Sequence, residues 1–159
     1  MASASVHTGS YQSIPDSATP GLLFLKAFLP SYDALGKPPT PLRDFFSNET
    51  RFTTNSKDAS PVGQVLQGFV KRVERLAKLY HEVAVAYDIG NGDGSRTVIF
   101  EGINGRVLKN DPEQRETRVK EVTVIELKPV DGKLVAVDVR TTMENHSLTQ
   151  LQRQLGVGA

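Results

Sequence analysis

Between Glu82 and Met143 the sequence alternates apolar and polar residues in four successive runs, and this pattern constrains the fold more than any other feature. A period of two is typical of β-strands that bury one face. The runs are Glu82–Ile89, Arg96–Leu108, Arg118–Leu127 and Leu134–Met143. The segments between them are short and rich in Gly, Asn, Asp and Pro, which favour hairpin turns. Because no helix fits between the runs, the sequence predicts an antiparallel meander and not a parallel βαβ sheet.

The first helix is expected to begin at Thr19-Pro20, an N-cap followed by proline at the first helical position. Its apolar residues have helical spacing, and Pro30 should kink or divide it. A short helix over Leu42–Phe46 and a strand over Thr50–Thr54 follow.

A longer amphipathic helix is predicted after Ser60-Pro61. Its apolar stripe consists of Val62, Val65, Leu66, Phe69, Val70, Val73, Leu76 and Ala77. The basic residues Lys71, Arg72, Arg75 and Lys78 lie off the stripe and are expected on the solvent face. Gly102 and Gly105, inside the longest strand, predict a bulge or a bend, which a strongly curved sheet requires.

The chain of 159 residues is long enough for one domain with its own core. Residues 1–18 contain few large apolar groups and are predicted to form a flexible N-terminal tail, although Tyr11 and Ile14 could dock onto the domain. Residues 19–159 are expected to form a single α+β domain.

The composition limits the functions that the chain can have. A formal net charge of +1 argues against a nucleic-acid partner and against a polybasic membrane anchor. The longest apolar stretch is too short to span a bilayer. The chain has no cysteine, so disulfides, thiolate catalysis and cysteine-bound metals are excluded. Together with the lack of a visible signal peptide, this predicts a cytoplasmic protein.

The predicted order of elements resembles the cone-shaped fold of ketosteroid isomerase, scytalone dehydratase, nuclear transport factor two and the SnoaL-like cyclases, over roughly residues 20–146. Local features are similar to SnoaL-like proteins of fungi. They are Asn48–Phe52 at the start of the first strand, Tyr80–Val83 at the junction of helix and strand, Tyr87–Ile89 before a glycine-rich turn, and Val137–Glu144 in the last strand.

The resemblance implies a curved antiparallel sheet wrapped around N-terminal helices, with a pocket between the sheet and the helices. It implies a hydrophobic small-molecule substrate, a homodimer formed across the sheet, and isomerisation, cyclisation, dehydration or hydrolysis without a cofactor. The same fold also occurs in proteins that only bind, so it does not establish a function.

Asp138 and Arg140 lie two residues apart on one strand face among apolar neighbours, so both could reach one cavity. There Asp138 would move a proton, and Arg140 would stabilise the resulting oxyanion. An ordinary ion pair on an exposed strand face explains the pattern equally well. Glu121 is a further catalytic candidate, with a solvated edge position as its alternative.

His81 is placed between the long helix and the sheet and is the one histidine inside the expected core region. Its imidazole titrates near neutral pH and could act as acid or base. A histidine at a helix C-terminus, interacting with the helix dipole, is the alternative.

Five residues are expected to contact the substrate: Tyr32, Tyr87, Phe52, Phe69 and Asn104. A tyrosine hydroxyl could donate a hydrogen bond to a substrate carbonyl, although core packing also explains each tyrosine. Three scattered histidines do not indicate a metal site. The sequence thus favours a cofactor-independent isomerase, cyclase or dehydratase for a polyketide or terpenoid intermediate of secondary metabolism. The alternative is a dimeric module that binds a hydrophobic molecule or a partner protein without chemistry.

Overall fold

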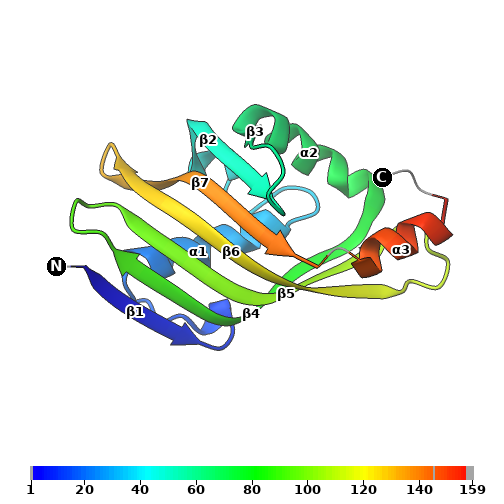
Figure 1. The fold of residues 1–159 in the computed structure, drawn as a ribbon, viewed down its shortest axis with the longest axis horizontal. Helices are drawn as coiled ribbons and strands as arrows, with labels where there is room; N and C mark the ends of the chain where they lie inside the picture. The colour runs from blue at the N-terminus through cyan, green and yellow to red at the C-terminus, as the bar shows by residue number, and fades with distance from the viewer. Residues whose placement is uncertain (1, 145, 157–159) are drawn as a thin grey trace.

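The computed structural model describes residues 2–144 and 146–156, so the last three residues of the expected domain lie outside it. Its strands are β1 (Ser3–Thr8), β2 (Phe46–Thr54), β3 (Ser60–Pro61), β4 (Leu76–Gly90), β5 (Arg96–Leu108), β6 (Glu116–Val130) and β7 (Lys133–Met143). Its helices are α1 (Pro20–Asp33), α2 (Val62–Arg75) and α3 (His146–Gln154), with 3-10 turns at Tyr11–Ser13 and Leu42–Phe45. The strands form one sheet (Figure 1) in the order β1-β4-β5-β6-β7-β2-β3.

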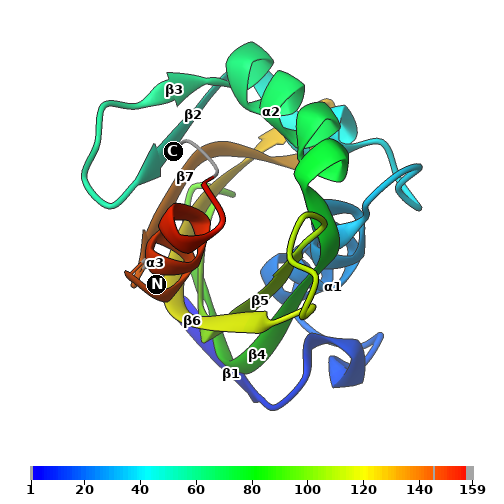
Figure 2. The same ribbon diagram turned by 90° about the vertical axis from the view of Figure 1, so that its right-hand side faces the viewer.

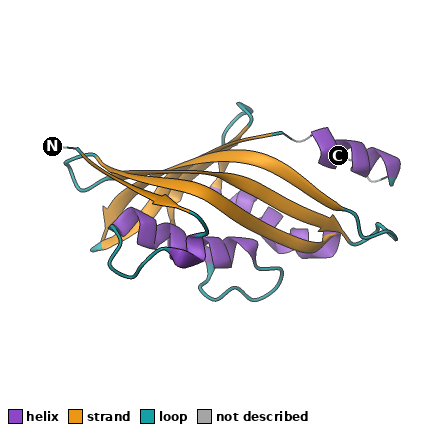
Figure 3. Ribbon diagram, turned by 90° about the horizontal axis from the view of Figure 1, so that it is seen from below, coloured by secondary structure: helices purple, strands orange, loops and turns teal. Residues whose placement is uncertain are grey.

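The predicted meander is confirmed, because β4, β5, β6 and β7 pair antiparallel in succession. The sheet as a whole is mixed, since β2 pairs with β7 in parallel. This parallel pair was not predicted: β2 and β7 are far apart in the sequence, and no local turn fixes their direction. Helices α1 and α2 lie on one face of the sheet (Figure 3), and the sheet curves towards them when seen along the strands (Figure 2).

A bulge in β4 contributes to the curvature. The register between β4 and β5 shifts between Val83 and Val85, opposite Gly102. A Cβ atom on Gly102 would collide with the Glu82 carbonyl oxygen, so only glycine allows this close approach of the two strands. The irregularity predicted at Gly102 is therefore present, but the extra residue belongs to the neighbouring strand.

The N-terminal segment is not a flexible tail. Residues Ser3–Thr8 pair antiparallel with Val85–Gly90 of β4 and form an edge strand of the sheet. Tyr11 and Ile14 are buried in the main core. The few apolar residues of this segment are enough to dock it because backbone hydrogen bonds to β4 supply most of its contacts.

The two long helices also differ from the sequence pattern. α1 continues past Pro30 to Asp33 without being divided. α2 ends at Arg75, so Leu76 and Ala77 begin β4 instead of completing an apolar helix stripe. Within α2, Val70 is 74% exposed and Arg72 only 8% exposed, the reverse of the prediction.

Arg72 is buried because its guanidinium group binds the C-terminal end of α1. Nη2 donates to the carbonyl oxygens of Tyr32 and, at 3.0 Å, of Ala34. These carbonyls lie at a helix end, where they have no partner inside the helix. The hydrogen bonds compensate for removing the charge from water, which helical periodicity alone cannot reveal.

At the other end of α1, a buried carboxylate anchors the helix to the sheet. Asp88 of β4 accepts hydrogen bonds from the Gly21 backbone N–H at 2.8 Å and from Arg96 Nε at 2.7 Å. A Cβ atom on Gly21 would collide with this carboxylate. The contact thus requires glycine in the first turn of α1. None of the described helices is long and apolar enough to cross a membrane.

We expect Asp88→Asn to destabilise the fold by about 3–5 kcal/mol, because it leaves the partly buried Arg96 without its counter-charge. Urea denaturation at pH 7 measures the free energy of unfolding. Asp16→Asn is the matched control, since Asp16 forms an exposed ion pair with Lys26 and its loss should change stability little. Equal effects of the two substitutions would contradict the anchoring role of Asp88.

Candidate active site

His81 is the centre of a buried polar network at the C-terminal end of α1. It is the sixth residue of β4, and its side chain is 3% exposed. Asp33, the last residue of α1, contacts Nδ1 of the His81 ring with Oδ1 and accepts the His81 backbone N–H with Oδ2 at 2.8 Å. Asp33 thereby fixes both the position and the orientation of the ring.

Two further groups meet Nε2 on the opposite side of the ring. Glu121 Oε1 of β6 lies 2.8 Å from Nε2, and Asn104 Nδ2 of β5 lies 2.9 Å from it. The Glu121 side chain is 1% exposed. Three strands and one helix therefore bring four polar side chains together in an apolar surrounding.

The amide of Asn104 has a defined orientation. Arg106 Nε donates to Asn104 Oδ1 at 2.7 Å, so the amide NH2 group faces His81 and Glu121. An amide N–H can only donate, so its contact with Nε2 suits the neutral imidazole that keeps its proton on Nδ1. Glu121 instead suits the imidazolium, whose Nε2–H can donate to a carboxylate. The site thus offers a partner to each protonation state of His81.

The surroundings of His81 favour the charged form. Burial lowers the pKa of His81, but hydrogen bonds to Asp33 and Glu121 and their negative charges raise it, and the net result is a pKa of about 9. The helix-dipole explanation considered from the sequence is wrong for His81, because the residue lies in a strand and its partners are carboxylates.

The Tyr32 ring packs edge-on against His81, with ring centroids 5.3 Å apart. Burial raises the pKa of Tyr32 to about 12, and the charge of Glu121 adds to this effect. The phenol therefore keeps its proton at neutral pH and can donate a hydrogen bond.

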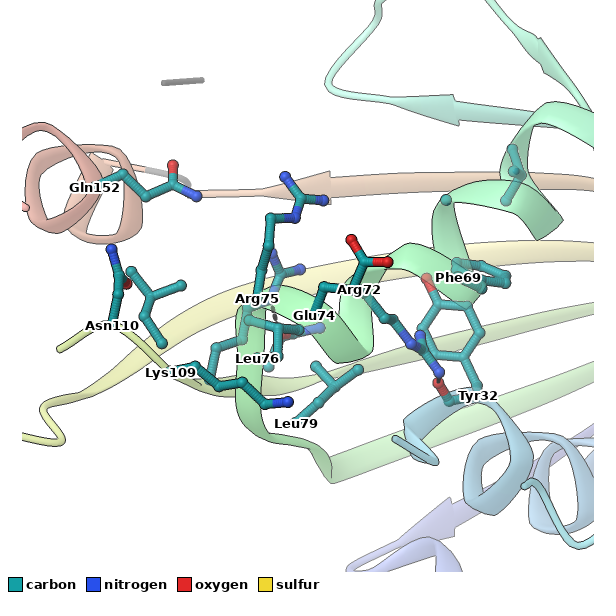
Figure 4. A pocket seen from close by; sticks show the side chains of 15 residues that line it. Tyr32, Phe69, Arg72, Glu74, Arg75, Leu76, Leu79, Lys109, Asn110 and Gln152 are labelled. Carbon is teal, nitrogen blue, oxygen red and sulfur yellow. Dashed lines mark hydrogen bonds between the residues drawn. The ribbon is translucent and has the colours of Figure 1, made fainter. Parts of the chain in front are cut away.

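A cavity of about 550 Å³ lies beside this network, between α2 and strands β4 and β5 (Figure 4). Its apolar walls come from Val65, Phe69, Leu76, Leu79 and Leu108. Tyr32 and Asn104 line it as well, whereas His81 lies behind them. Gln152 of α3 completes the far end. The cavity is large enough for a small organic molecule.

Of the sequence-predicted residues, the structure brings His81, Glu121, Asn104 and Tyr32 together, with Phe69 in contact with Tyr32 at 5.1 Å between ring centroids. The ring of Phe52 packs on Phe69 at a centroid distance of 6.4 Å, in the core next to the cavity.

Asp138 and Arg140 do not belong to this group. Arg140 Nη1 lies 3.2 Å from Asp138 Oδ2, and Arg140 Nη2 donates to Glu126 at 2.9 Å. Their side chains are 30% and 51% exposed. The expectation that they share the cavity is wrong: they form the alternative, an ion pair on a solvated strand face.

Tyr87 also points away from the cavity. It is half-buried in β4, between Ala86 and Asp88, whose side chains are fully buried on the inner face. Since successive side chains of a strand alternate, Tyr87 lies on the outer face. The bulge between Val83 and Val85 shifts this alternation relative to His81, so simple counting from His81 misplaces the face.

Sequence reasoning missed Asp33, Arg72 and Arg106. The available signal for Asp33 was its position: an acidic residue in the last turn of a helix is disfavoured by the helix dipole and needs a compensating partner. Arg106 follows Asn104 at a spacing of two, which places both on one strand face. For Arg72, no pattern distinguished it from its solvent-exposed neighbours.

Within the described residues, no group of three or more His, Cys, Asp and Glu side chains is placed to hold a metal ion. Asp33 and Glu121 approach different nitrogens of the His81 ring from opposite sides.

No protein-family model matches the sequence, and no curated protein matches it. Solved structures do match the fold. A hexachlorocyclohexane dehydrochlorinase, LinA type 2, has a TM-score of 0.61 at 11% identity, over 76% of this chain and 80% of its own. A candidate SnoaL-like polyketide cyclase from Shewanella denitrificans has a TM-score of 0.61 at 9% identity, over 84% and 97% of the two chains.

A candidate scytalone dehydratase from Novosphingobium aromaticivorans has a TM-score of 0.56 at 8% identity, over 65% of this chain and 68% of its own. These likenesses confirm the fold implied by the sequence resemblance: a curved sheet around helices, as in SnoaL-like and nuclear transport factor two-like proteins. At such low identity they establish the fold and not the reaction.

The raised pKa of His81 predicts a pH-dependent stability. The imidazolium is stabilised in the folded state, so this contribution is complete below the unfolded value of about 6.5 and is lost as the pH rises through about 9. We expect the free energy of unfolding, measured with urea, to fall between pH 6.5 and 9. In the His81→Asn variant, the part of this decrease in the free energy of unfolding that the His81 imidazole causes should be absent. A direct check is the NMR titration of His81, which should show a midpoint well above that of an exposed histidine.

Proposed function

We propose that the protein is a cofactor-independent enzyme of the isomerase, cyclase or dehydratase type, in which His81 transfers a proton to and from a bound substrate. The observation that carries this proposal is the buried imidazole with a carboxylate on Nδ1 and alternative partners on Nε2. A group that has a partner in both protonation states is suited to general acid–base chemistry.

In the proposed reaction, neutral His81 accepts a proton from a carbon atom next to a substrate carbonyl. The electron pair moves onto the carbonyl oxygen, where the protonated Tyr32 hydroxyl donates a hydrogen bond to the developing enolate. Asp33 holds the ring and stabilises the imidazolium that forms. Returning the proton from His81 to another carbon completes an isomerisation. If a hydroxyl group on the neighbouring carbon takes this proton instead, it leaves as water while the enolate electrons form a C=C bond, which completes a dehydration.

His81 does not itself line the cavity, so the substrate has to reach Nε2 where Asn104 now contacts it. Asn104 and Tyr32 border both the cavity and His81. In our proposal, a movement of the Asn104 amide exposes Nε2, and Glu121 receives the resulting imidazolium N–H.

The apolar walls around the cavity support a hydrophobic substrate, and we include a polyketide- or terpenoid-type intermediate of secondary metabolism in the proposal. We also propose a homodimer across the outer face of the sheet. A second hollow of about 520 Å³ there has Ile103 and the 40% exposed Val122 among its lining residues. The lack of cysteine is compatible with the cytoplasm, where we place the protein.

One observation favours a second candidate, a binding module without chemistry. Both ring nitrogens of His81 are occupied by protein groups, and Tyr32 and Asn104 separate the ring from the cavity. In such a module the network would serve only to connect α1 with the sheet.

Hydrogen–deuterium exchange at carbon separates the two candidates without knowledge of the substrate. The unmodified protein should catalyse exchange of the acidic C–H groups of 2-tetralone or 2-indanone in D2O, followed by NMR, with a rate that rises towards pH 9 as neutral His81 accumulates. We expect His81→Asn to reduce this rate by about 100-fold or more and Asp33→Asn to reduce it less.

His7→Asn is the matched control, because His7 lies in β1 and bonds to Ser10 and Ser13, away from the cavity. It should leave the exchange rate unchanged. If these ketones bind but His81→Asn exchanges their protons as fast as the unmodified protein, the binding-only candidate replaces the enzyme.

A further inference from the structure

The side chains around the cavity have an unbalanced charge. Arg72, Arg75, Arg106 and Lys109 line it, against Glu74 as the one acidic residue among its described lining residues. The sequence as a whole carries a net charge of only +1, so this excess is a property of the cavity and not of the composition.

Two of the cations are adjacent at one end of the cavity. The Lys109 backbone N–H donates to the Arg75 carbonyl oxygen at 2.9 Å, where α2 gives way to β4 and β5 ends. Leu76 and Leu108, the next residues on the two strands, are paired in the sheet. Figure 4 shows Arg75 and Lys109 between the Asn110–Gln152 end and the Tyr32–Phe69 end.

Arg106 continues this cationic line towards the His81 network. Arg106 follows Asn104 by two residues and is half-buried. Its Nε donates a hydrogen bond to the neutral amide of Asn104. Among the described residues, no carboxylate lies within 4.0 Å of Arg75, Arg106 or Lys109. A half-buried guanidinium without a counter-charge is costly, which favours an anionic occupant.

Arg72 provides a second, independent observation. Its Nη2 donates hydrogen bonds to the carbonyl oxygens at the end of α1, but its Nε is buried and has no hydrogen-bond partner in the described structure. Native proteins leave few such donors unpaired, and this one belongs to a residue that lines the cavity.

From this arrangement we infer that the cavity binds a small monocarboxylate with an apolar body. The carboxylate lies among Arg106, Arg75 and Lys109, and the apolar body lies against Phe69, Leu79 and Tyr32. An arginine fork and a carboxylate match in geometry and form strong charge-assisted hydrogen bonds. The inference rests on the proposed function in using the same cavity, and it specifies the chemical class of its ligand.

Isothermal titration with matched pairs of ligands tests the inference. The pairs are 2-naphthylacetate with 2-naphthylacetamide and 4-phenylbutyrate with 4-phenylbutyramide, which differ in charge but hardly in size. We expect each carboxylate to bind about tenfold or more tightly than its amide at low salt. The preference should shrink at high ionic strength, because part of the cationic line is exposed.

Neutral variants locate the effect. Arg106→Gln and the double variant Arg75→Gln with Lys109→Gln should each remove most of the preference, with folding verified by circular dichroism. Lys71→Gln is the control of equal charge change: Lys71 is exposed on α2 and does not line the cavity, so the preference should persist. Equal affinity within both pairs, binding of neither pair, or an equal loss in Lys71→Gln overturns the inference.

The same titration with His81→Asn separates this inference from the proposed function. His81 lies behind the cavity wall, so the variant should keep the carboxylate preference while losing proton exchange. If the unmodified protein does not catalyse proton exchange at carbon but still prefers carboxylates to amides, the proposed enzyme is refuted and the inferred ligand class is not. If the protein catalyses proton exchange at carbon but binds each carboxylate no more tightly than its amide, the inferred ligand class is refuted and the proposed enzyme is not.

Discussion

Helix α1 is attached to strand β4 at both of its ends by carboxylates, Asp88 fully buried and Asp33 partly buried, and the candidate site depends on this double attachment. At the first turn, Asp88 of the strand accepts the Gly21 N–H. At the last residue, Asp33 of the helix accepts the backbone N–H of His81 and holds its ring. Because the helix cannot slide or rotate on the strand without breaking one of these contacts, the Tyr32–Asp33 end is held in register with His81. Arg72 adds a third attachment from α2.

The polar network can be understood as one charged system. Two carboxylates and one imidazole share a region from which water is largely excluded. The His81 ring lies between the carboxylates of Asp33 and Glu121, which reduces the repulsion between their negative charges. The cost of burial, which lowers the pKa of His81, is exceeded by the two acidic partners. Such opposing effects are typical of functional sites, although structural ion pairs produce them as well. The adjacent cavity is the observation that supports a catalytic role for this network in our proposal.

Much of the fold followed from local patterns in the sequence. The meander was predictable because hairpin turns join strands that are neighbours in the chain. Along β6, alternation puts Glu121 on the same face as the buried Ile125 and Leu127. Alternation alone cannot place Tyr87 or Asp138 on a face, because register shifts interrupt β4 after Val83 and the β6–β7 pair at Glu126. A bulge depends on contacts between strands, which no single-strand pattern contains.

The parts of the site that escaped prediction are those defined by long-range contacts. Asp33 and His81 are 48 residues apart, and Arg72 reaches carbonyls of α1 from 38 and 40 residues away. Apolar periodicity describes which face of an element is covered, but it does not identify the polar groups that meet there. Asn104, Tyr32 and His81 were recognised as candidates from their residue types, but His81 was expected at the junction of helix and strand and lies inside β4.

The pairing of β1 along β4 has a consequence for variants that lack the N-terminal residues. β4 carries both His81 and Asp88, and its outer hydrogen-bonding edge from Val85 to Gly90 is covered only by the first residues of the chain. A shortened N-terminus would leave a row of free amide and carbonyl groups that invites another polypeptide to add itself to the sheet. β1 therefore covers this edge of β4 and prevents another chain from pairing with it.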